Sequence, residues 1–263
     1  MSAPAVFAFN NALVRTPCHA IVNGLRAVDL GAPSYQTVLG EHKAYVDALE
    51  AAGVSVETLP ALDAYPDSMF VEDPALVFTE GAIVMRPGAS SRFGEAQELA
   101  PVLRRRFSRV IALPGPGFAD GGDVLVLKDR VMIGLSDRTN ETGATALADG
   151  LRALGKNPEV VRTPANVLHF KSDCSLLDER TILSTTRLAA SGVFDGLDVI
   201  LTPEGEEGAA NALRINECVF LGAAFPKTYA RLEAAGYRVI PLATREIAKV
   251  DAGLSCMSLR WWA

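Results

Sequence analysis

Residues 75–113 read ALVFTEGAIVMRPGASSRFGEAQELAPVLRRRFSRVIAL, and this stretch contains the unit from which the fold is predicted. Two short apolar runs flank a polar turn at Glu80 and Gly81, a pattern typical of a β-hairpin. Apolar side chains then recur at helical spacing over 94–107, and a third apolar run over 109–113 indicates a strand. The stretch therefore predicts a hairpin, a helix and a strand in succession.

The same unit recurs three more times along the chain. Successive hairpin turns are separated by roughly 40 to 50 residues, a spacing typical of propellers and repeat arrays. The further hairpins are predicted over 124–135, 174–184 and 212–223, the helices over 139–154, 187–193 and 227–235, and the strands over 159–162, 198–201 and 237–241.

The two ends of the chain supply the parts of a fifth unit. We predict strands over 6–10, 54–59 and 257–261, and a helix over 35–52. If the first and last strands meet, the five units close into a ring without exposed sheet edges, which otherwise favour aggregation. All 263 residues then belong to a single domain. Alternating strands and helices also permit other topologies, so the pattern alone leaves a generic α/β or α+β domain open.

Composition places the chain among ordinary globular proteins. A net charge of −6 with 49% hydrophobic and 21% charged residues excludes disordered, collagen-like and coiled-coil chains. The acidic balance argues against a nucleic-acid partner. No uncharged apolar run approaches the ~18 residues of a membrane span, and no positively charged region precedes an apolar stretch at the N-terminus. We therefore expect a cytoplasmic protein without nucleic-acid or membrane partners.

One of the four cysteines stands out as a candidate nucleophile. The chain has no C-x-x-C pair and no disulfide framework, so we expect free thiols. Cys174 and Cys218 lie within apolar strand patterns and Cys18 in a loop, which indicates packing roles. Residues 251–258 (DAGLSCMS) instead bring a carboxylate and a glycine close to the thiol of Cys256, among small polar neighbours that allow close approach.

Histidine is scarce, and only one histidine has a context suited to catalysis. His42 lies in a charged helical pattern and is expected to be a solvated surface residue. His169 opens the third hairpin within residues 167–172 (VLHFKS), where apolar neighbours would tune its pKa toward neutrality. A catalytic pair of His169 and Cys256 is one interpretation, and a structural histidine on an apolar strand is the other.

Two acidic segments are unusual for their surroundings. Glu72 and Asp73 are adjacent within an apolar segment, with Asp67 just before them, and burying such carboxylates is costly without a cation. The cation is either an arginine elsewhere in the chain or a positively charged substrate. In the second segment, residues 118–124 (FADGGDV), Asp120 precedes two glycines that permit unusual backbone angles. No phosphate-binding loop or dinucleotide fingerprint is present.

Six motifs in order resemble those of the dimethylarginine dimethylaminohydrolase family, and together they span nearly the whole chain. They are FVED (70–73), RPGASSR (86–92), DGGDV (120–124), GLSDRTN (134–140), LHFKS (168–172) and LSCMS (254–258). The resemblance implies the fold of the guanidine-modifying (pentein) superfamily. This fold is a five-bladed, pseudo-symmetric α/β propeller of ββαβ units, and the repeat described above matches it independently.

The resemblance also implies roles for individual residues. Cys256 would be the nucleophile, His169 the general acid and base, and Asp120 the carboxylate that orients the histidine. The remaining implied site residues bind the substrate: Glu72 and Asp73 the guanidinium, Asp67 the α-ammonium, Arg92 and Arg138 the α-carboxylate, Leu25 as part of a mobile lid over residues 20–32, and Asp251 elsewhere in the pocket.

The implied activity is hydrolysis of Nω-methylated arginine to citrulline and an alkylamine, through a covalent alkylthiouronium on Cys256. Neither a metal nor an organic cofactor is expected. The expected partners are a small-molecule substrate and, in a homodimer, a second copy of the chain. For Cys18 and His19 near the lid, loop packing is favoured over adventitious zinc binding. The alternatives are an arginine deiminase-like hydrolase of another guanidino compound, a non-catalytic pentein binding protein and a Rossmann-like binding protein.

Overall fold

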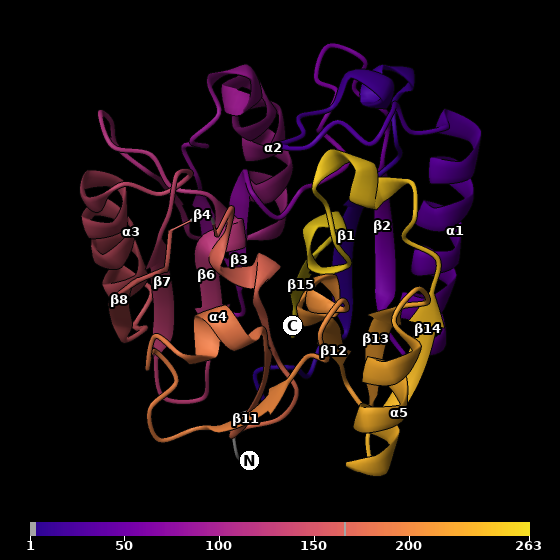
Figure 1. Cartoon of the computed structure of the whole chain (residues 1–263). Coiled ribbons are helices and arrows are strands. Elements are labelled where there is room, and N and C mark those ends of the chain that lie inside the picture. Colours follow the sequence, from indigo (N-terminus) through magenta and orange to yellow (C-terminus); the bar gives the residue numbers. More distant parts are fainter. Residues whose placement is uncertain (1–3, 166) are drawn as a thin grey trace.

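The computed structural model describes residues 4–165 and 167–263. Over this part of the chain the strands form five three-stranded sheets. In each sheet the central strand pairs antiparallel with one neighbour and parallel with the other, which is the arrangement of a hairpin followed by a helical crossover. Each sheet with its helix is one blade of a propeller (Figure 1).

The stretch that opened the sequence analysis forms one blade as predicted. Strands β3 (Ala75–Phe78) and β4 (Gly81–Val84) form the hairpin, α2 (Phe93–Arg106) follows, and β5 (Val110–Ala112) pairs parallel with β4. The tight turn requires glycine at position 81. A Cβ there would lie 2.5 Å from the carbonyl oxygen of Arg109, just before β5, and the φ angle of Gly81 is +153°.

Three further blades repeat this order of elements and confirm the predicted units. Their helices are fixed at the start by local caps: Asn140 and Thr185 accept hydrogen bonds from the first turns of α3 and α4, and α5 begins with a proline. The elements are β6 (Val124–Val126), β7 (Val131–Leu135), α3 (Glu141–Ala153) and β8 (Pro158–Arg162); β9 (Cys174–Leu176), β10 (Thr181–Ser184), α4 (Thr186–Ala189) and β11 (Asp198–Leu201); and β12 (Leu213–Ile215), β13 (Cys218–Gly222), α5 (Pro226–Ala234) and β14 (Arg238–Leu242).

The fifth blade joins the two ends of the chain. Strand β1 (Asn11–Arg15) pairs antiparallel with β15 (Leu259–Trp261) and, after α1 (Tyr35–Ala51), parallel with β2 (Ser55–Leu59). The N- and C-terminal strands therefore close the ring, and the prediction of a five-bladed α/β propeller is confirmed.

The first and last strands do not lie where the sequence predicted them. The strand predicted over 6–10 is wrong, because β1 starts at Asn11. The backbone of Phe9 donates to and accepts from the side chain of Asn216, and Phe7 accepts from the Asn216 backbone, so this apolar segment serves a distant hairpin turn. The last strand begins at Leu259 rather than at Met257, because residues 255–257 form a 3-10 turn.

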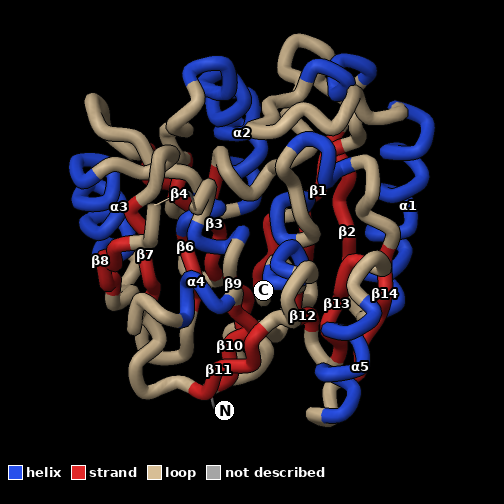
Figure 2. Tube along the Cα trace, in the orientation of Figure 1, coloured by secondary structure: helices blue, strands red, loops and turns tan. Residues whose placement is uncertain are grey.

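The strands lie inside and the helices outside. Figure 2 shows α1 and α3 at the two sides of the molecule, with the strands between them. Where neighbouring blades meet, β15 contacts β3, β12 contacts β9 and β6 contacts β9. None of the helices in the described part of the chain has the length and apolarity to cross a bilayer. A cytoplasmic location and a single domain over residues 1–263 stay predictions.

His42 is buried, which contradicts the prediction of a solvated surface residue. Only 6% of it is exposed, on the face of α1 that carries Val38, Tyr45 and Leu49 into the core. Its Nε2 is buried and has no hydrogen-bond partner among the residues that the structure describes. Burial lowers the pKa of His42 to about 4. The helical face was misread because the flanking charged residue Glu41 is itself buried, accepting hydrogen bonds from two backbone amides near residue 246.

Acid should therefore destabilise the protein through His42. Its folded pKa lies below the unfolded value near 6.5, so its stabilising contribution is complete above pH 6.5 and is lost as the pH falls toward 4. We expect the wild type to lose about 2 to 3 kcal/mol more than His42→Leu between pH 7 and pH 4.5 in urea unfolding. The exposed His19, replaced by Leu, serves as the control. Equal losses in wild type and His42→Leu would contradict this result.

Candidate active site

Segments from all five blades meet at a small cavity of about 30 Å³. Eight of the ten residues that the sequence analysis placed in the site line this cavity, although they are scattered over more than 230 positions of the chain. The predicted residues that line it are Leu25, Asp67, Asp73, Arg92, Arg138, His169, Asp251 and Cys256. Asp120 lies behind His169, and Glu72 lies behind the wall of the cavity.

Cys256 lies in the 3-10 turn Ser255–Met257 that leads into β15. Its backbone carbonyl accepts a hydrogen bond from the amide of Glu72 at 3.2 Å, and the Ser255 amide donates to the side chain of Asn211 at 3.2 Å. These contacts fix the turn to two other blades. They hold the thiol, which is 8% exposed, at the wall of the cavity.

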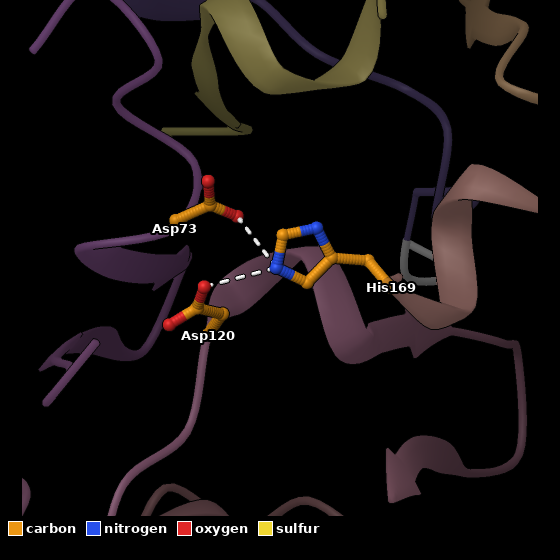
Figure 3. A group of neighbouring side chains, drawn as sticks. All are labelled: Asp73, Asp120 and His169. Carbon is orange, nitrogen blue, oxygen red and sulfur yellow. Dashed lines mark hydrogen bonds and ion pairs between the residues drawn. The ribbon is translucent and has the colours of Figure 1, made fainter. Parts of the chain in front are cut away.

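His169 and Asp120 form a hydrogen-bonded pair between two blades. The Nε2 atom of His169 lies 2.9 Å from Oδ2 of Asp120 and 4.0 Å from Oδ1 of Asp73 (Figure 3). Asp120 is completely buried, and its other carboxylate oxygen accepts a hydrogen bond from the Gly88 amide at 2.7 Å. The side chain of Asp120 is thus long enough to reach the imidazole. Figure 3 shows that the other ring nitrogen of His169, Nδ1, points away from both carboxylates.

The two glycines after Asp120 are needed for close packing at this site. A Cβ on Gly121 would lie 2.0 Å from the carbonyl oxygen of Glu72, and a Cβ on Gly122 would lie 2.9 Å from the imidazole of His169. The Gly122 amide also donates to Asp73 at 3.1 Å. Residues with side chains would therefore push the segment of Glu72 and Asp73, the turn after Asp120 and the histidine apart.

The carboxylates around the cavity favour the protonated forms of both His169 and Cys256. Burial would lower the pKa of His169, but the charge of Asp73 and the hydrogen bond to Asp120 outweigh it and raise that pKa to about 9. Burial, reinforced by the charges of Asp73 and Glu72, raises the pKa of the Cys256 thiol to about 12. At neutral pH and without a substrate, the site therefore holds an imidazolium beside a neutral thiol.

Asp123 is a positioning residue that the sequence analysis did not assign. It is completely buried and accepts hydrogen bonds from the hydroxyls of Ser136 and Thr139 and from the amide of Phe170, at 2.6 to 2.8 Å. Burial raises its pKa to about 6. Because Phe170 follows His169 directly, Asp123 fixes the backbone that carries the imidazole. The signal in the sequence was a second carboxylate placed directly before an apolar strand.

Glu72 has intramolecular cationic partners. Its carboxylate binds Lys171 at 2.6 Å and Arg260 at 2.9 Å, and it accepts a hydrogen bond from the Ser255 hydroxyl at 2.8 Å. Of the two readings of the buried acidic pair, the structural ion pair therefore describes Glu72. By its bond to Ser255, Glu72 supports the turn that carries Cys256.

Asp73 also has a resident cation, although it lines the cavity. The guanidinium of Arg92 binds Oδ2 of Asp73 and, through three hydrogen bonds of 2.8 to 3.1 Å, the carboxylate of Glu95. Burial would raise the pKa of Asp73, but Arg92 and His169 outweigh it and hold the pKa below its usual range. For Glu95 burial outweighs Arg92, and its pKa rises to about 7. Glu95, another positioning residue absent from the sequence analysis, holds Arg92 from behind.

The two arginines predicted to bind a carboxylate differ in their surroundings. Arg92 is 4% exposed and bound to two carboxylates, so most of its donors are occupied. Arg138 is half-buried at the cavity wall, and no ion pair involves it among the described residues. Its charge is felt at Asp67 and Asp251, where it opposes the rise in pKa that burial causes. Arg138 is therefore the more available cation.

The segment predicted as a lid lies over the cavity and is fastened to two of its carboxylates. The amide of Leu25 donates to Asp67 at 3.0 Å, and the amide of Ala27 donates to Asp251. Asp251 itself has a left-handed backbone, with φ of 54°, which turns its side chain out of the preceding helical turn. A cavity of about 30 Å³ has room for about one water molecule, so an opening movement of the lid stays a prediction.

One group of three potential metal ligands exists among the described residues, namely Asp73, Asp120 and His169, with ligand atoms within 4.8 Å of one another. Each is already engaged, and an imidazolium does not ligate a metal. The group is better described as a hydrogen-bonded acid–base cluster. Near the lid, Cys18 contacts the Tyr65 carbonyl at 3.6 Å and the adjacent His19 stacks on Tyr35, in line with loop packing.

Comparisons with known proteins identify the family. A family model described as "N,N dimethylarginine dimethylhydrolase, eukaryotic" matches residues 30–161. The chain is 37% identical to the N(G),N(G)-dimethylarginine dimethylaminohydrolase of Pseudomonas aeruginosa, over 96% of this chain and 100% of that protein. The chain belongs to the dimethylarginine dimethylaminohydrolase family. A protein with the same name from Streptomyces coelicolor is 32% identical over 95% of this chain and 96% of its own length.

Solved structures of dimethylarginine dimethylaminohydrolase match the fold throughout. A cysteine-to-serine mutant of the Pseudomonas aeruginosa enzyme, complexed with citrulline, superposes with a TM-score of 0.93 at 37% identity, covering 97% of this chain and 100% of that one. The N-terminal domain of a cyanobacterial arginine dihydrolase, bound to product, shares the fold with a TM-score of 0.85 at 18% identity, covering 95% of this chain and 96% of that one.

Membership of the dimethylarginine dimethylaminohydrolase family makes the chain a hydrolase, and the non-catalytic and Rossmann-like alternatives are set aside.

Within the cavity, sequence reasoning missed the apolar part of the wall. These residues carry no chemical signature, and only the fold brings them together: Phe70, Leu168, Val250 and Ala252.

Proposed function

We propose that the chain hydrolyses Nω-methylated arginines to citrulline and an alkylamine. The observation that carries the proposal is one small cavity whose wall holds the Cys256 thiol and His169, with Asp120 bound to His169 from behind, together with charges that suit a zwitterionic guanidine. The citrulline complex of the Pseudomonas aeruginosa relative supports the same product. Asp120 orients His169, and Cys256 is the nucleophile.

The substrate itself activates the nucleophile. A thiol with a pKa of about 12 is not ionised at neutral pH, and the nearby Asp73 and Glu72 oppose its ionisation. A guanidinium bound beside Asp73 offsets those negative charges and stabilises the thiolate, so the thiol proton passes to solvent water when a cationic substrate binds. Because this activation depends on the substrate's charge, the nucleophile stays protonated and unreactive between turnovers.

The reaction then proceeds in two stages, formation of a covalent adduct and its hydrolysis. The Cys256 thiolate attacks the guanidinium carbon, and the tetrahedral adduct expels the alkylamine, which takes the proton of the His169 imidazolium. The carbon stays bound to sulfur as an alkylthiouronium. His169, now neutral, removes a proton from water, and the oxygen attacks the same carbon. The carbon–sulfur bond then breaks, and the proton left on the adduct passes to the departing sulfur, which gives neutral citrulline and the Cys256 thiol. His169 is again protonated for the next turnover, with a pKa of about 9 that suits an acid at neutral pH.

The other end of the cavity suits the amino-acid part of the substrate. Asp67 and Asp251 each hold a lid amide and would exchange it for the α-ammonium group, while Arg138 is the available cation for the α-carboxylate. Arg92 lines the cavity as well, but it is held by Asp73 and Glu95, so we assign it mainly to positioning Asp73. A homodimer stays a prediction.

A substrate panel tests the function. Citrulline or carbamoyl product formation is measured with asymmetric dimethylarginine, monomethylarginine, arginine and agmatine, which lacks the carboxylate. We expect methylated arginines to be processed best and agmatine to lose about 2 to 5 kcal/mol in kcat/KM, roughly 30-fold to several thousand-fold, because Arg138 would be left unpaired. In Arg138→Ala, dimethylarginine should lose a similar factor and agmatine should change little.

Arg152→Ala, an exposed arginine on α3 far from the cavity wall, is the control and should leave all four substrates unchanged. Faster turnover of arginine than of its methylated forms, with release of ammonia, would favour the arginine deiminase-like alternative. Equal efficiency on agmatine and dimethylarginine would show that the pocket does not recognise the amino-acid end, and the assigned substrate class would be wrong.

A further inference from the structure

A second, larger cavity lies between α2 and the sheet of the same blade. Its volume is about 390 Å³, within the range of pockets that hold small organic molecules. It shares no lining residue with the cavity around Cys256, so it is a separate feature of the fold. The position of the nearby helix α2, with alanines on its inner side, leaves this space open rather than filled by larger side chains.

The floor of this cavity is apolar and its polar rim is cationic. Apolar side chains from β4, from α2 and from the residues that follow β4 and β5 form the floor. They are Val84, Met85, Ala96 and Leu113. Within the described part of the chain, the charged residues in the lining are two arginines, Arg86 and Arg104, and no carboxylate lines the cavity. An apolar floor with two guanidinium groups is complementary to an apolar molecule that carries one anionic group.

Arg86 is placed so that a ligand would complete its hydrogen bonding. Its guanidinium lies 4.7 Å from the ring centre of Phe93, and its Nε is buried without an acceptor among the described residues. The Arg86 backbone is fixed, since its carbonyl accepts from the Ala119 amide at 2.9 Å. Stacking on Phe93 holds the fork of donors rigidly, which favours a planar, bidentate acceptor such as a carboxylate.

Arg104 supplies the second charge from the last turns of α2. It is exposed, and no ion pair engages it among the described residues, whereas Arg106 two positions later binds Glu57. Arg86 likewise has no carboxylate partner in the described part of the chain. Two arginines without a carboxylate partner among the described residues therefore lie beside one apolar cavity, where both are available to an anionic ligand.

We propose that this cavity is a binding site for a small organic monocarboxylate with an aromatic or branched apolar body, held by Arg86 and Arg104. The apolar floor distinguishes this ligand from inorganic phosphate, which would gain nothing from it. The carboxylate distinguishes it from a neutral apolar molecule, which would leave both arginines unpaired. The proposal does not depend on the substrate of the Cys256 site, because the two cavities share no residue.

The test uses 3-phenylpropionate as the probe, with 3-phenylpropionamide and inorganic phosphate as comparisons, titrated against the full chain by chemical-shift perturbation. We expect saturable binding of the carboxylate with shifts centred on α2 and β4, and at least tenfold weaker binding of the amide and of phosphate. Arg104→Gln should weaken binding of the carboxylate at least tenfold. Because Arg104 is exposed, this variant should keep its fold.

Arg105→Gln is the matched control, since Arg105 is the next residue of the same helix, is exposed and does not line the cavity. It should bind the probe as the wild type does. Equal binding of carboxylate and amide, equal loss in both arginine variants, or binding of phosphate as tight as that of the probe would overturn the proposal. Shifts centred on Cys256 and His169 instead would assign the probe to the catalytic cavity and would overturn it too.

Discussion

Cys256→Ser is expected to lower kcat by about 10³-fold or more while the protein still folds, because a hydroxyl has a far higher pKa than a thiol and cannot be ionised by the bound guanidinium. Serine nearly matches cysteine in volume, and the turn that carries residue 256 is held through backbone atoms. The measurements are citrulline formation under substrate saturation and a thermal melt. In acid-quenched wild type, mass spectrometry should detect the alkylthiouronium adduct, which should be absent from the variant.

Cys218→Ser is the matched control for this change. Cys218 is also a buried free thiol, 5% exposed, in the same apolar cluster as Cys256, but it lies in β13 and does not line the cavity. We expect this variant to lose some stability and to keep its kcat. Retention of more than a few per cent of activity in Cys256→Ser would show that Cys256 is not the nucleophile.

Asp73→Asn should lower kcat/KM by about 30-fold to several thousand-fold, which corresponds to about 2 to 5 kcal/mol for loss of one member of a buried charge pair. Three effects act together. The guanidinium of the substrate loses its carboxylate acceptor, the pKa of His169 falls because Asp73 no longer raises it, and Arg92 loses one of its two anionic partners. The last effect also lowers stability, which a thermal melt detects.

Asp173→Asn separates these effects from simple loss of a buried ion pair. Asp173 is 2% exposed and is bound to Arg187 and Thr185, yet it lies outside the cavity. We expect a comparable loss of stability with kcat/KM close to that of the wild type. If the activities of the two variants fall only in proportion to their unfolded fractions, Asp73 has a structural role alone and the proposed guanidinium contact is wrong.

The fold was predictable because each blade carries its own local signals. Polar turns separate short apolar runs, and the helices begin with caps such as Asn140 or with a proline such as Pro226. Each unit can therefore be predicted from its own local sequence. The first strand was misplaced for the opposite reason. Residues 7–9 look like a strand, but their backbone groups bind Asn216, and no local pattern reveals a partner more than 200 positions away.

The site was predictable in membership but not in its connections. Five of the predicted site residues that line the cavity lie in the ordered motifs, and the ring brings segments of the different blades to the same point. Which cation neutralises Asp73 or Glu72 depends on tertiary distances, and Arg92, Lys171 and Arg260 could not be assigned to them from spacing. Burial of His42 was missed likewise, since a helical pattern does not show which face a neighbouring blade covers.

The fastening of the lid sets a kinetic limit on catalysis. Because Asp67 and Asp251 hold the amides of Leu25 and Ala27, neither carboxylate is free to receive an α-ammonium group in the closed conformation. Encounters between substrate and closed enzyme are therefore unproductive, whatever the diffusion rate. At high substrate concentration, capture proceeds no faster than these two hydrogen bonds break, so the opening rate of a short loop, rather than affinity for the guanidinium, sets the ceiling on the association rate.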